Sequence, residues 1–303
     1  MKHYFHICAD GEDARFFITG RKDFLAAINI IALCAANTNV CVVAFALEDT
    51  HPHFLLYGTH EECCRFKALF ECLYRHYAAE TRKGKKTKDK LVLHCELYPI
   101  GDDESYLRNV TVYTIIQPTK DGKRVMPYDY FWGTGCLYFR TDYFTPVWFF
   151  DAEGNICHPV RFGDLSVQSR REMVHSRSLT LPDDWLVCNG IVLPTNYVDV
   201  ARFESIYQTH NCFRVFLSNN RKKEEEILLR MAKARGIMLE DGEAREVCGN
   251  ECKAMFGTRD PRKLSSEQRI RIAQVLRSKY RMTFRQIASC VRLPETEIRI
   301  YVP

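Results

Sequence analysis

Residues 39–58, "NVCVVAFALEDTHPHFLLYG", read as two buried strands joined by a tight turn, and the rest of the fold can be built outward from them. The polar pair Asp49–Thr50 marks the turn between the two apolar runs. Side chains alternate between the two faces of a strand, so an extended stretch points His51 and His53 the same way. Two imidazoles on one face can hold a metal ion. Pro52 lies between them and has no N–H to donate, so we expect it at the very beginning of its strand.

The flanking segments complete a recognisable order of elements. Apolar residues in the second helical segment recur at three- and four-residue steps, which is typical of an amphipathic helix. The segments are a strand at 3–9, a helix at 21–37, the strand pair, a helix at 60–80 and a strand at 91–100. The order β-α-β-β-α-β is that of the ferredoxin-like split unit. It predicts an α+β fold with an antiparallel sheet in which the third strand is internal.

Composition narrows the class of protein. The chain has 303 residues, enough for one large domain or two modest ones. No apolar run approaches the roughly 20 residues of a membrane span, and "MKHYFHICAD" becomes acidic too soon for a signal peptide. We therefore expect a cytoplasmic protein with no membrane partner. Among its 14 cysteines, Cys248 and Cys252 have no second pair at zinc-finger spacing, so we expect them one turn apart on a helix.

We divide the chain into three parts: residues 1–140, an aromatic-rich extension of mixed strand and loop at 141–200, and a helical region at 201–303. The net charge of +5 is uneven, because residues 262–303 carry about +7 and the first 261 residues about −2. A basic segment on a near-neutral body favours a polyanionic partner, most simply nucleic acid. The alternative is an ordinary solvated helix surface.

Residues 264–302 have the pattern of a helix-turn-helix. Ser265 with Gln268, and Thr283 with Gln286, have the spacing of capping boxes that begin two successive helices, and Pro294 can begin a third. Such a module can place its last helix in a DNA major groove, although many three-helix bundles share the pattern without binding DNA. The side chains that we expect to face DNA are Arg285, Glu295, Thr296 and Arg299.

A second chemical feature lies in the helix predicted at 102–116. Tyr113 and Gln117 are four residues apart and share one helix face. A phenol can act as a covalent nucleophile, and an amide oxygen beside two imidazoles suits Mg²⁺ or Mn²⁺ acting on a phosphoryl oxygen. Tyr106, two turns earlier, is the rival nucleophile. A histidine pair without a third ligand is more often structural than metal-binding.

These features together resemble the single-tyrosine HUH transposases, and among them the REP-associated tyrosine transposases. That family has a ferredoxin-like sheet with His-x-His on its third strand and a helical Tyr-x-x-x-(Gln/Asn)-Pro after the fourth. The likeness covers residues 1 to about 140, where the matching segments are "VVAFALEDTHPHFLL", "YLRNVTVYTIIQP" and "YDYFWGTG". The chain departs from the family at Pro52, where a bulky hydrophobe is usual, and at Thr50 and Gln117, where Asn is usual.

The resemblance implies a metal-dependent single-stranded DNA endonuclease and strand transferase that acts on hairpin-forming DNA, as a monomer or homodimer. Mg²⁺ or Mn²⁺ held by His51, His53 and Gln117 would polarise the scissile phosphate. Tyr113 would attack it, leaving a 5′-phosphotyrosine and a free 3′-hydroxyl. Four lysines in the loop before the fourth strand would grip the DNA backbone, or form an ordinary solvated loop: Lys83, Lys85, Lys86 and Lys88.

Two other functions compete with this one. The first is a non-catalytic, domesticated DNA-binding or regulatory protein that uses the C-terminal helix-turn-helix. The second, a ferredoxin-like RNA binder, is weaker because it predicts exposed aromatic side chains on the sheet, where this sequence offers histidines.

Overall fold

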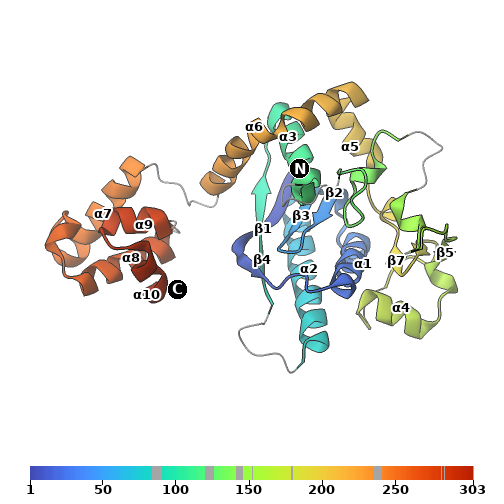
Figure 1. The fold of residues 1–303 in the computed structure, drawn as a ribbon, viewed down its shortest axis with the longest axis horizontal. Helices are drawn as coiled ribbons and strands as arrows, with labels where there is room; N and C mark the ends of the chain where they lie inside the picture. Colours follow the sequence, from blue (N-terminus) through green and yellow to red (C-terminus); the bar gives the residue numbers. More distant parts are fainter. Residues whose placement is uncertain are drawn as a thin grey trace. The chain divides into compact units, whose positions relative to one another are not determined.

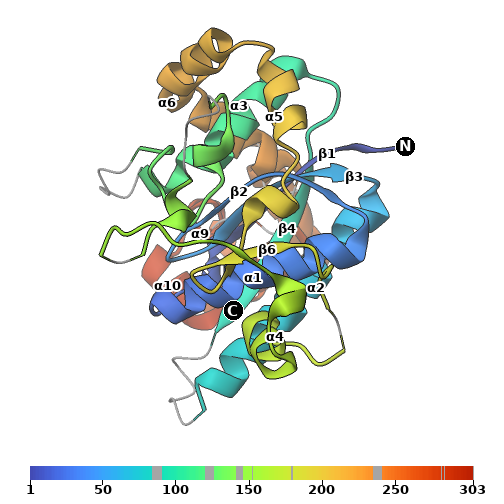
Figure 2. The ribbon, with the colours of Figure 1, turned by 90° about the vertical axis from the view of Figure 1, so that its right-hand side faces the viewer.

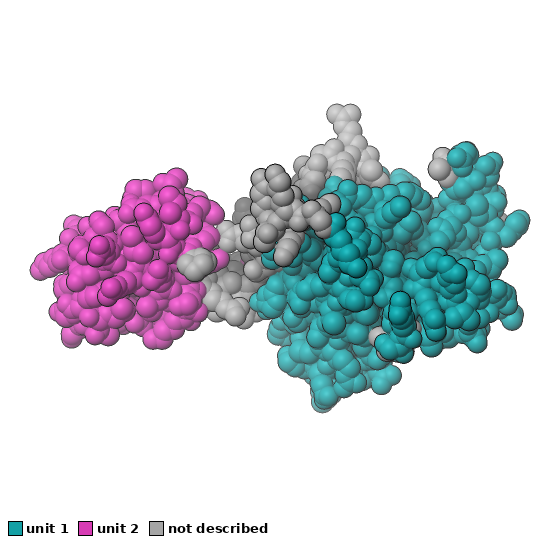
Figure 3. Space-filling model, turned by 90° about the horizontal axis from the view of Figure 1, so that it is seen from below, with its two compact units in different colours: residues 1–223 teal, residues 224–303 magenta. Residues whose placement is uncertain are grey.

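The computed structural model describes residues 1–83, 91–119, 126–140, 146–151, 153–178, 180–234, 241–280, 282 and 284–302. The chain divides into two compact units, residues 1–223 and 224–303 (Figure 3). Each unit buries apolar side chains of its own. Within the described ranges, no helix has the length and apolar character needed to cross a membrane.

The first unit is built on a four-stranded sheet (Figure 1). Its strand order is β2-β3-β1-β4, and every neighbouring pair is antiparallel. The elements are β1 (His3–Arg15), α1 (Arg21–Thr38), β2 (Cys41–Leu47), β3 (Pro52–Gly58), α2 (His60–Thr81) and β4 (Val92–Pro99). The α+β class, the β-α-β-β-α-β order and the internal position of the third strand are confirmed.

Helices cover both faces of this sheet (Figure 2). On one face Phe54 of β3 packs against Phe66 and Phe70 of α2, and α1 lies beside α2. On the other face lies α3 (Glu104–Ile116), which begins at Asp103, whose side chain accepts a hydrogen bond from the backbone N–H of Tyr106. Because strand side chains alternate, the neighbours of Phe54 point toward α3. His53 is therefore on the α3 face.

Pro52 is the first residue of β3, as the sequence predicts. It lies opposite Leu47 of β2, whose N–H donates instead to the carbonyl of Trp132. The turn before it is closed by a hydrogen bond from the N–H of Glu48 to the carbonyl of His51. A proline at this position removes no hydrogen bond from the interior of the sheet.

The outer edge of β2 is covered by residues 132–134 of the "YDYFWGTG" segment. Gly133 forms a bridge with Ala46, and the N–H of Thr134 donates to the carbonyl of Phe45. A side chain at Gly133 would approach that carbonyl to 3.3 Å, so glycine suits the close contact. The covered edge fixes the end of β2, after which the turn bearing Glu48 and His51 follows.

The aromatic-rich extension, predicted as mixed strand and loop, contains several short elements. Its strands form a second small sheet in the order β5-β6-β7. Helix α4 is hard to detect in sequence because its residues are mostly polar and only Val174 is buried. The elements of this part are β5 (Val160–Arg161), α4 (Val167–Val174), β6 (Leu186–Cys188) and β7 (Ile191–Val192). The predicted helical region follows and begins with α5 (Val200–Tyr207) and α6 (His210–Ala234).

The second unit contains α7 (Asp241–Phe256), α8 (Ser266–Tyr280), α9 (Phe284–Val291) and α10 (Glu295–Tyr301). The predicted capping box is present, because the N–H of Gln268 donates to Ser265 Oγ and the N–H of Ser265 donates to Gln268 Oε1. Cys248 and Cys252 lie one turn apart on α7 in the core, as predicted. Thr283 lies outside the described residues.

Replacing Asn29 with alanine should lower the free energy of unfolding of the first unit by about 1–3 kcal/mol. The buried Asn29 amide donates to the carbonyl of Gly190 at 2.9 Å and accepts from the N–H of Val192 at 2.9 Å, so it joins α1 to β7. All three tryptophans lie in residues 1–223, so their fluorescence during urea unfolding reports this unit. Asn37→Ala, an exposed position on the same helix, is the control. Equal losses for the two variants would contradict the assignment.

Candidate active site

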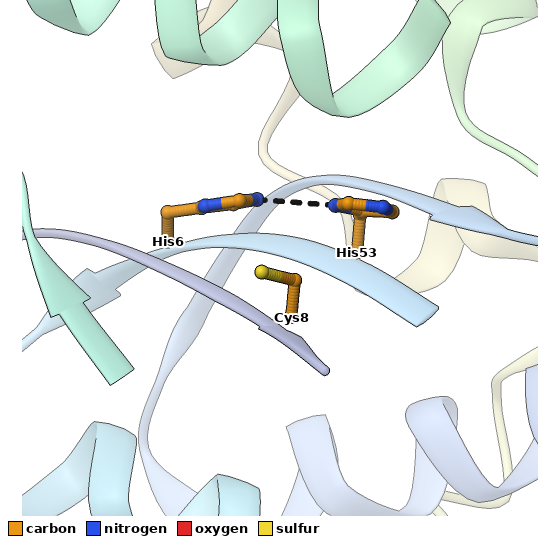
Figure 4. A group of neighbouring side chains, drawn as sticks. All are labelled: His6, Cys8 and His53. Carbon is orange, nitrogen blue, oxygen red and sulfur yellow. Dashed lines mark hydrogen bonds between the residues drawn. The ribbon is translucent and has the colours of Figure 1, made fainter. Parts of the chain in front are cut away.

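Three histidines lie in a row on the α3 face of the sheet. The Nε2 atom of His53 is 2.9 Å from Nε2 of His51, and its Nδ1 atom is 3.3 Å from Nε2 of His6. His6 and His53 are buried, and the side chain of His51 is 21% exposed. Figure 4 shows His6 and His53 side by side above the strands, with Cys8 beneath them. One ring nitrogen of His53 therefore faces His51, and the other faces His6.

The register of β1 and β3 creates this row. Cys8 lies directly opposite His53, so both side chains emerge on the same face. His6 is two residues before Cys8 and therefore shares that face as well. His51 precedes β3, and the turn that ends at Pro52 brings its ring back against His53.

Glu48 lies next to His51 in the same turn. Its buried carboxylate is 3.7 Å from His51 Nδ1. Burial and the nearby charges of Asp49 and Glu48 raise the pKa of Tyr130. Thr50 Oγ lies 2.7 Å from the same His51 nitrogen. If His51 Nε2 binds a metal, its Nδ1–H can donate to Thr50, which is how a ligand histidine is usually oriented.

Tyr113 of α3 packs against the histidine row. Its ring centroid is 5.7 Å from that of His53 and 5.9 Å from that of His6, both edge to face. Only 5% of Tyr113 is exposed. Tyr106 is equally buried on the same helix. The structure therefore brings His51, His53 and Tyr113 together.

Gln117 lies one helical turn beyond Tyr113, at the C-terminal cap of α3. It is 6% exposed, and its amide nitrogen has no hydrogen-bond partner among the described residues. A buried amide with an unpaired donor is costly unless a ligand or water satisfies it. This is the environment expected of a side chain that completes a polar site, and its role as a metal ligand stays a prediction.

Glu48, His51 and His53 form one group of possible metal donors. Carboxylate and imidazole donors meet at Glu48, His51 and His53, whose ligand atoms all lie within 4.8 Å of one another. Two ligands at right angles around an ion with bonds of 2.0–2.1 Å are about 2.9 Å apart. This separation equals the 2.9 Å between the Nε2 atoms of His51 and His53.

The predicted DNA-contacting residues fall in two places. Lys83 is exposed at the end of α2, whereas Lys85, Lys86 and Lys88 lie outside the described residues. In the second unit, Arg285 on α9 and Thr296 on α10 are exposed. Arg299 is exposed too, but its guanidinium is 2.8 Å from the Glu295 carboxylate and 4.7 Å from the ring centre of Phe284. Glu295 and Arg299 thus form a pair on the surface of α10.

Three residues of the group were not predicted from the sequence: His6, Cys8 and Glu48. Alternation along "HYFHICA" places His6 and Cys8 on one face, but only the register with β3 shows that His53 shares it. Glu48 is three residues before His51, a spacing that is visible in the sequence. Its relevance depends on the conformation of the turn.

Comparison of the chain with protein-family models, with curated proteins and with solved structures gives no match.

Replacing Glu48 with glutamine should weaken Mn²⁺ binding by at least about 10-fold, because it removes an anionic donor while preserving shape. Binding can be followed by electron paramagnetic resonance of free Mn²⁺. Asp49→Asn, which makes the same charge change one residue along, should leave the affinity within about 2-fold. Wild-type affinity in Glu48→Gln would exclude Glu48 as a ligand.

Proposed function

We propose that the chain is a metal-dependent single-stranded DNA endonuclease and strand transferase that cuts hairpin-associated DNA through a 5′-phosphotyrosine at Tyr113. The observation that carries this proposal is the contact of the Tyr113 ring with the ring of His53, which also groups with His51 and Glu48 as possible metal donors. A phenol beside a hard-cation site is suited to nucleophilic attack on a phosphodiester.

The architecture supports the same proposal. The order β-α-β-β-α-β with strand order β2-β3-β1-β4 is that of a ferredoxin-like sheet, the fold implied by the resemblance to HUH transposases. The histidine pair is at the start of the third strand, and the tyrosine is on the helix after the fourth. Pro52 does not separate the two imidazoles, since their Nε2 atoms are 2.9 Å apart.

His51 and His53, with Glu48 and Gln117 as candidates for the remaining ligands, would hold Mg²⁺ or Mn²⁺. Such an ion, when bound, polarises a phosphoryl oxygen and stabilises the charge that develops on it. The Tyr113 oxygen forms a bond to phosphorus while the bond from phosphorus to the 3′-oxygen breaks. The phenol loses its proton and the departing 3′-oxygen gains one. The phosphotyrosine bond keeps the energy of the phosphodiester, so no nucleotide cofactor is needed.

Access to the nucleophile requires a local rearrangement. Tyr113 is 5% exposed, whereas His51 is the most exposed of the three histidines. A phosphate can therefore approach first from the side of His51 and Glu48. It reaches the phenol only after the Tyr113 side chain rotates or the end of α3 moves.

The Tyr113→Phe variant should form no covalent adduct with DNA. Wild-type protein incubated with end-labelled single-stranded hairpin oligonucleotides and Mn²⁺ should give a complex that survives denaturing electrophoresis. Tyr106→Phe is the matched control, because it removes the same hydroxyl from an equally buried tyrosine on the same helix. An adduct with Tyr113→Phe, or none with wild type over a range of hairpins, would refute the proposed mechanism.

The second candidate function is DNA binding without cleavage, through the second unit. Its support is the local charge, with exposed basic side chains on α9 and α10 above a separate core. In a helix-turn-helix the last helix reads base edges and the neighbouring residues contact phosphates. This function is compatible with the first, since a nuclease of this kind can use a separate module to find its DNA.

Arg285→Ala should weaken DNA binding and reduce the slope of log K against log salt by about one. Removing one phosphate contact releases one fewer counterion. The measurement is fluorescence anisotropy at several salt concentrations with full-length protein. Lys253→Ala on α7, an exposed cation outside the helix-turn-helix, should leave the slope unchanged. An equal change of the slope in both variants would indicate nonspecific electrostatic attraction between the protein and DNA instead.

A further inference from the structure

A second group of metal donors lies on the other side of His53. His6, Cys8 and His53 are all at most 2% exposed, and their ligand atoms lie within 4.8 Å of one another. The planes of the two rings are nearly parallel, 15° apart, and Nε2 of His6 lies 3.3 Å from Nδ1 of His53. Figure 4 shows the Cys8 side chain beneath the two rings, on the same face of the sheet. Two nitrogens and one sulfur thus meet in one buried place.

The spacing of these donors differs from that on the Glu48 side. A tetrahedral ion with Zn–N bonds of 2.0–2.1 Å places two ligand nitrogens about 3.3–3.4 Å apart. The His6–His53 separation is 3.3 Å, which is also long for a hydrogen bond. The His51–His53 separation of 2.9 Å is closer to the right angle of an octahedral ion. Each side of His53 therefore has the spacing of a different coordination geometry.

We infer that His6, Cys8 and His53 form a binding site for a borderline transition ion such as Zn²⁺, and that occupation of this site excludes the hard cation from Glu48, His51 and His53. Thiolate and imidazole donors select zinc and its relatives, whereas carboxylate donors suit Mg²⁺ and Mn²⁺. The three protein ligands leave a fourth tetrahedral position for water. Cys8 loses its proton when the ion binds. The buried pocket then holds a divalent cation next to one thiolate.

Exclusion follows from the chemistry of one imidazole, and this part rests on the proposed function. A neutral histidine has one N–H and one lone pair. When Nδ1 of His53 binds zinc, the proton is on Nε2, which faces His51 and can no longer bind Mn²⁺. Zinc would therefore switch the nuclease off by fixing the other tautomer of His53.

Cobalt(II) absorption tests the site without any assay of activity. One equivalent of Co²⁺ added to reduced full-length protein should produce a thiolate-to-cobalt charge-transfer band together with tetrahedral d–d bands. Zinc should displace both. Cys8→Ser should remove the charge-transfer band and lower the affinity by more than about 100-fold, since even outer partners of ligands contribute 10–100-fold. His51→Ala should retain the band, because His51 belongs to the other group.

Two further cysteine variants control for cobalt binding to other buried thiols. Cys95→Ser changes a buried thiol on the neighbouring strand that points to the opposite face, since Cys95 lies opposite Ala9. Cys248→Ser changes the close thiol pair of the second unit, whose sulfurs are 4.0 Å apart. Both variants should keep the cobalt spectrum. A band that survives in Cys8→Ser, or disappears in Cys248→Ser, overturns the inference.

X-ray absorption of zinc in the wild-type protein needs no variant and should give one sulfur ligand. A zinc coordination shell with no sulfur atom, or with three, contradicts the proposed site even if Cys8→Ser fails to fold. In the adduct assay with Mn²⁺, one equivalent of Zn²⁺ should abolish the reaction of wild type but not that of Cys8→Ser. A cobalt band that depends on Cys8, with no adduct under any condition, would sustain the metal site and refute the nuclease. Equal inhibition of both proteins would refute the exclusion.

Discussion

The pairing of β1 with β3 is the constraint on which the candidate site depends. Cys8 lies opposite His53, and a slip of one residue would turn Cys8 and His6 toward α2 instead of α3. The pairing of β2 with β3 adds a second condition, because Ala46 lies opposite His53 on the other side. A small side chain there leaves room for α3 to approach the sheet. The ring of Tyr113 can then reach both histidines.

Local rules account for the part of this site that sequence could predict. Alternation along a strand gave His51 and His53 a common side, and the missing N–H of Pro52 placed that residue at the start of β3. His6 and Cys8 escaped prediction because a strand register is a relation between distant segments. Glu48 escaped because its approach to His51 depends on a turn closed by one backbone hydrogen bond.

The same contrast between local and long-range interactions distinguishes the C-terminal helices from the aromatic-rich extension. The capping box of Ser265 and Gln268 involves residues three apart, so the beginning of α8 could be read directly from the sequence. In the aromatic-rich extension the strands have only two or three residues, too few for a periodic signal. They are held by side chains far away in sequence, such as the Asn29 amide that bonds to both Gly190 and Val192.

Thr50 and His6 provide polar partners for the Nδ1 atoms of His51 and His53. If a cation binds both Nε2 atoms, Thr50 can accept from Nδ1–H of His51, and His6 Nε2 can accept from Nδ1–H of His53. Both arrangements leave an Nε2 lone pair for a metal, and the two Nε2 atoms face each other. Thr50 thus gives His51 a polar partner in the turn that precedes β3. His6 does the same for His53 from β1, a strand distant in sequence from the His-x-His stretch.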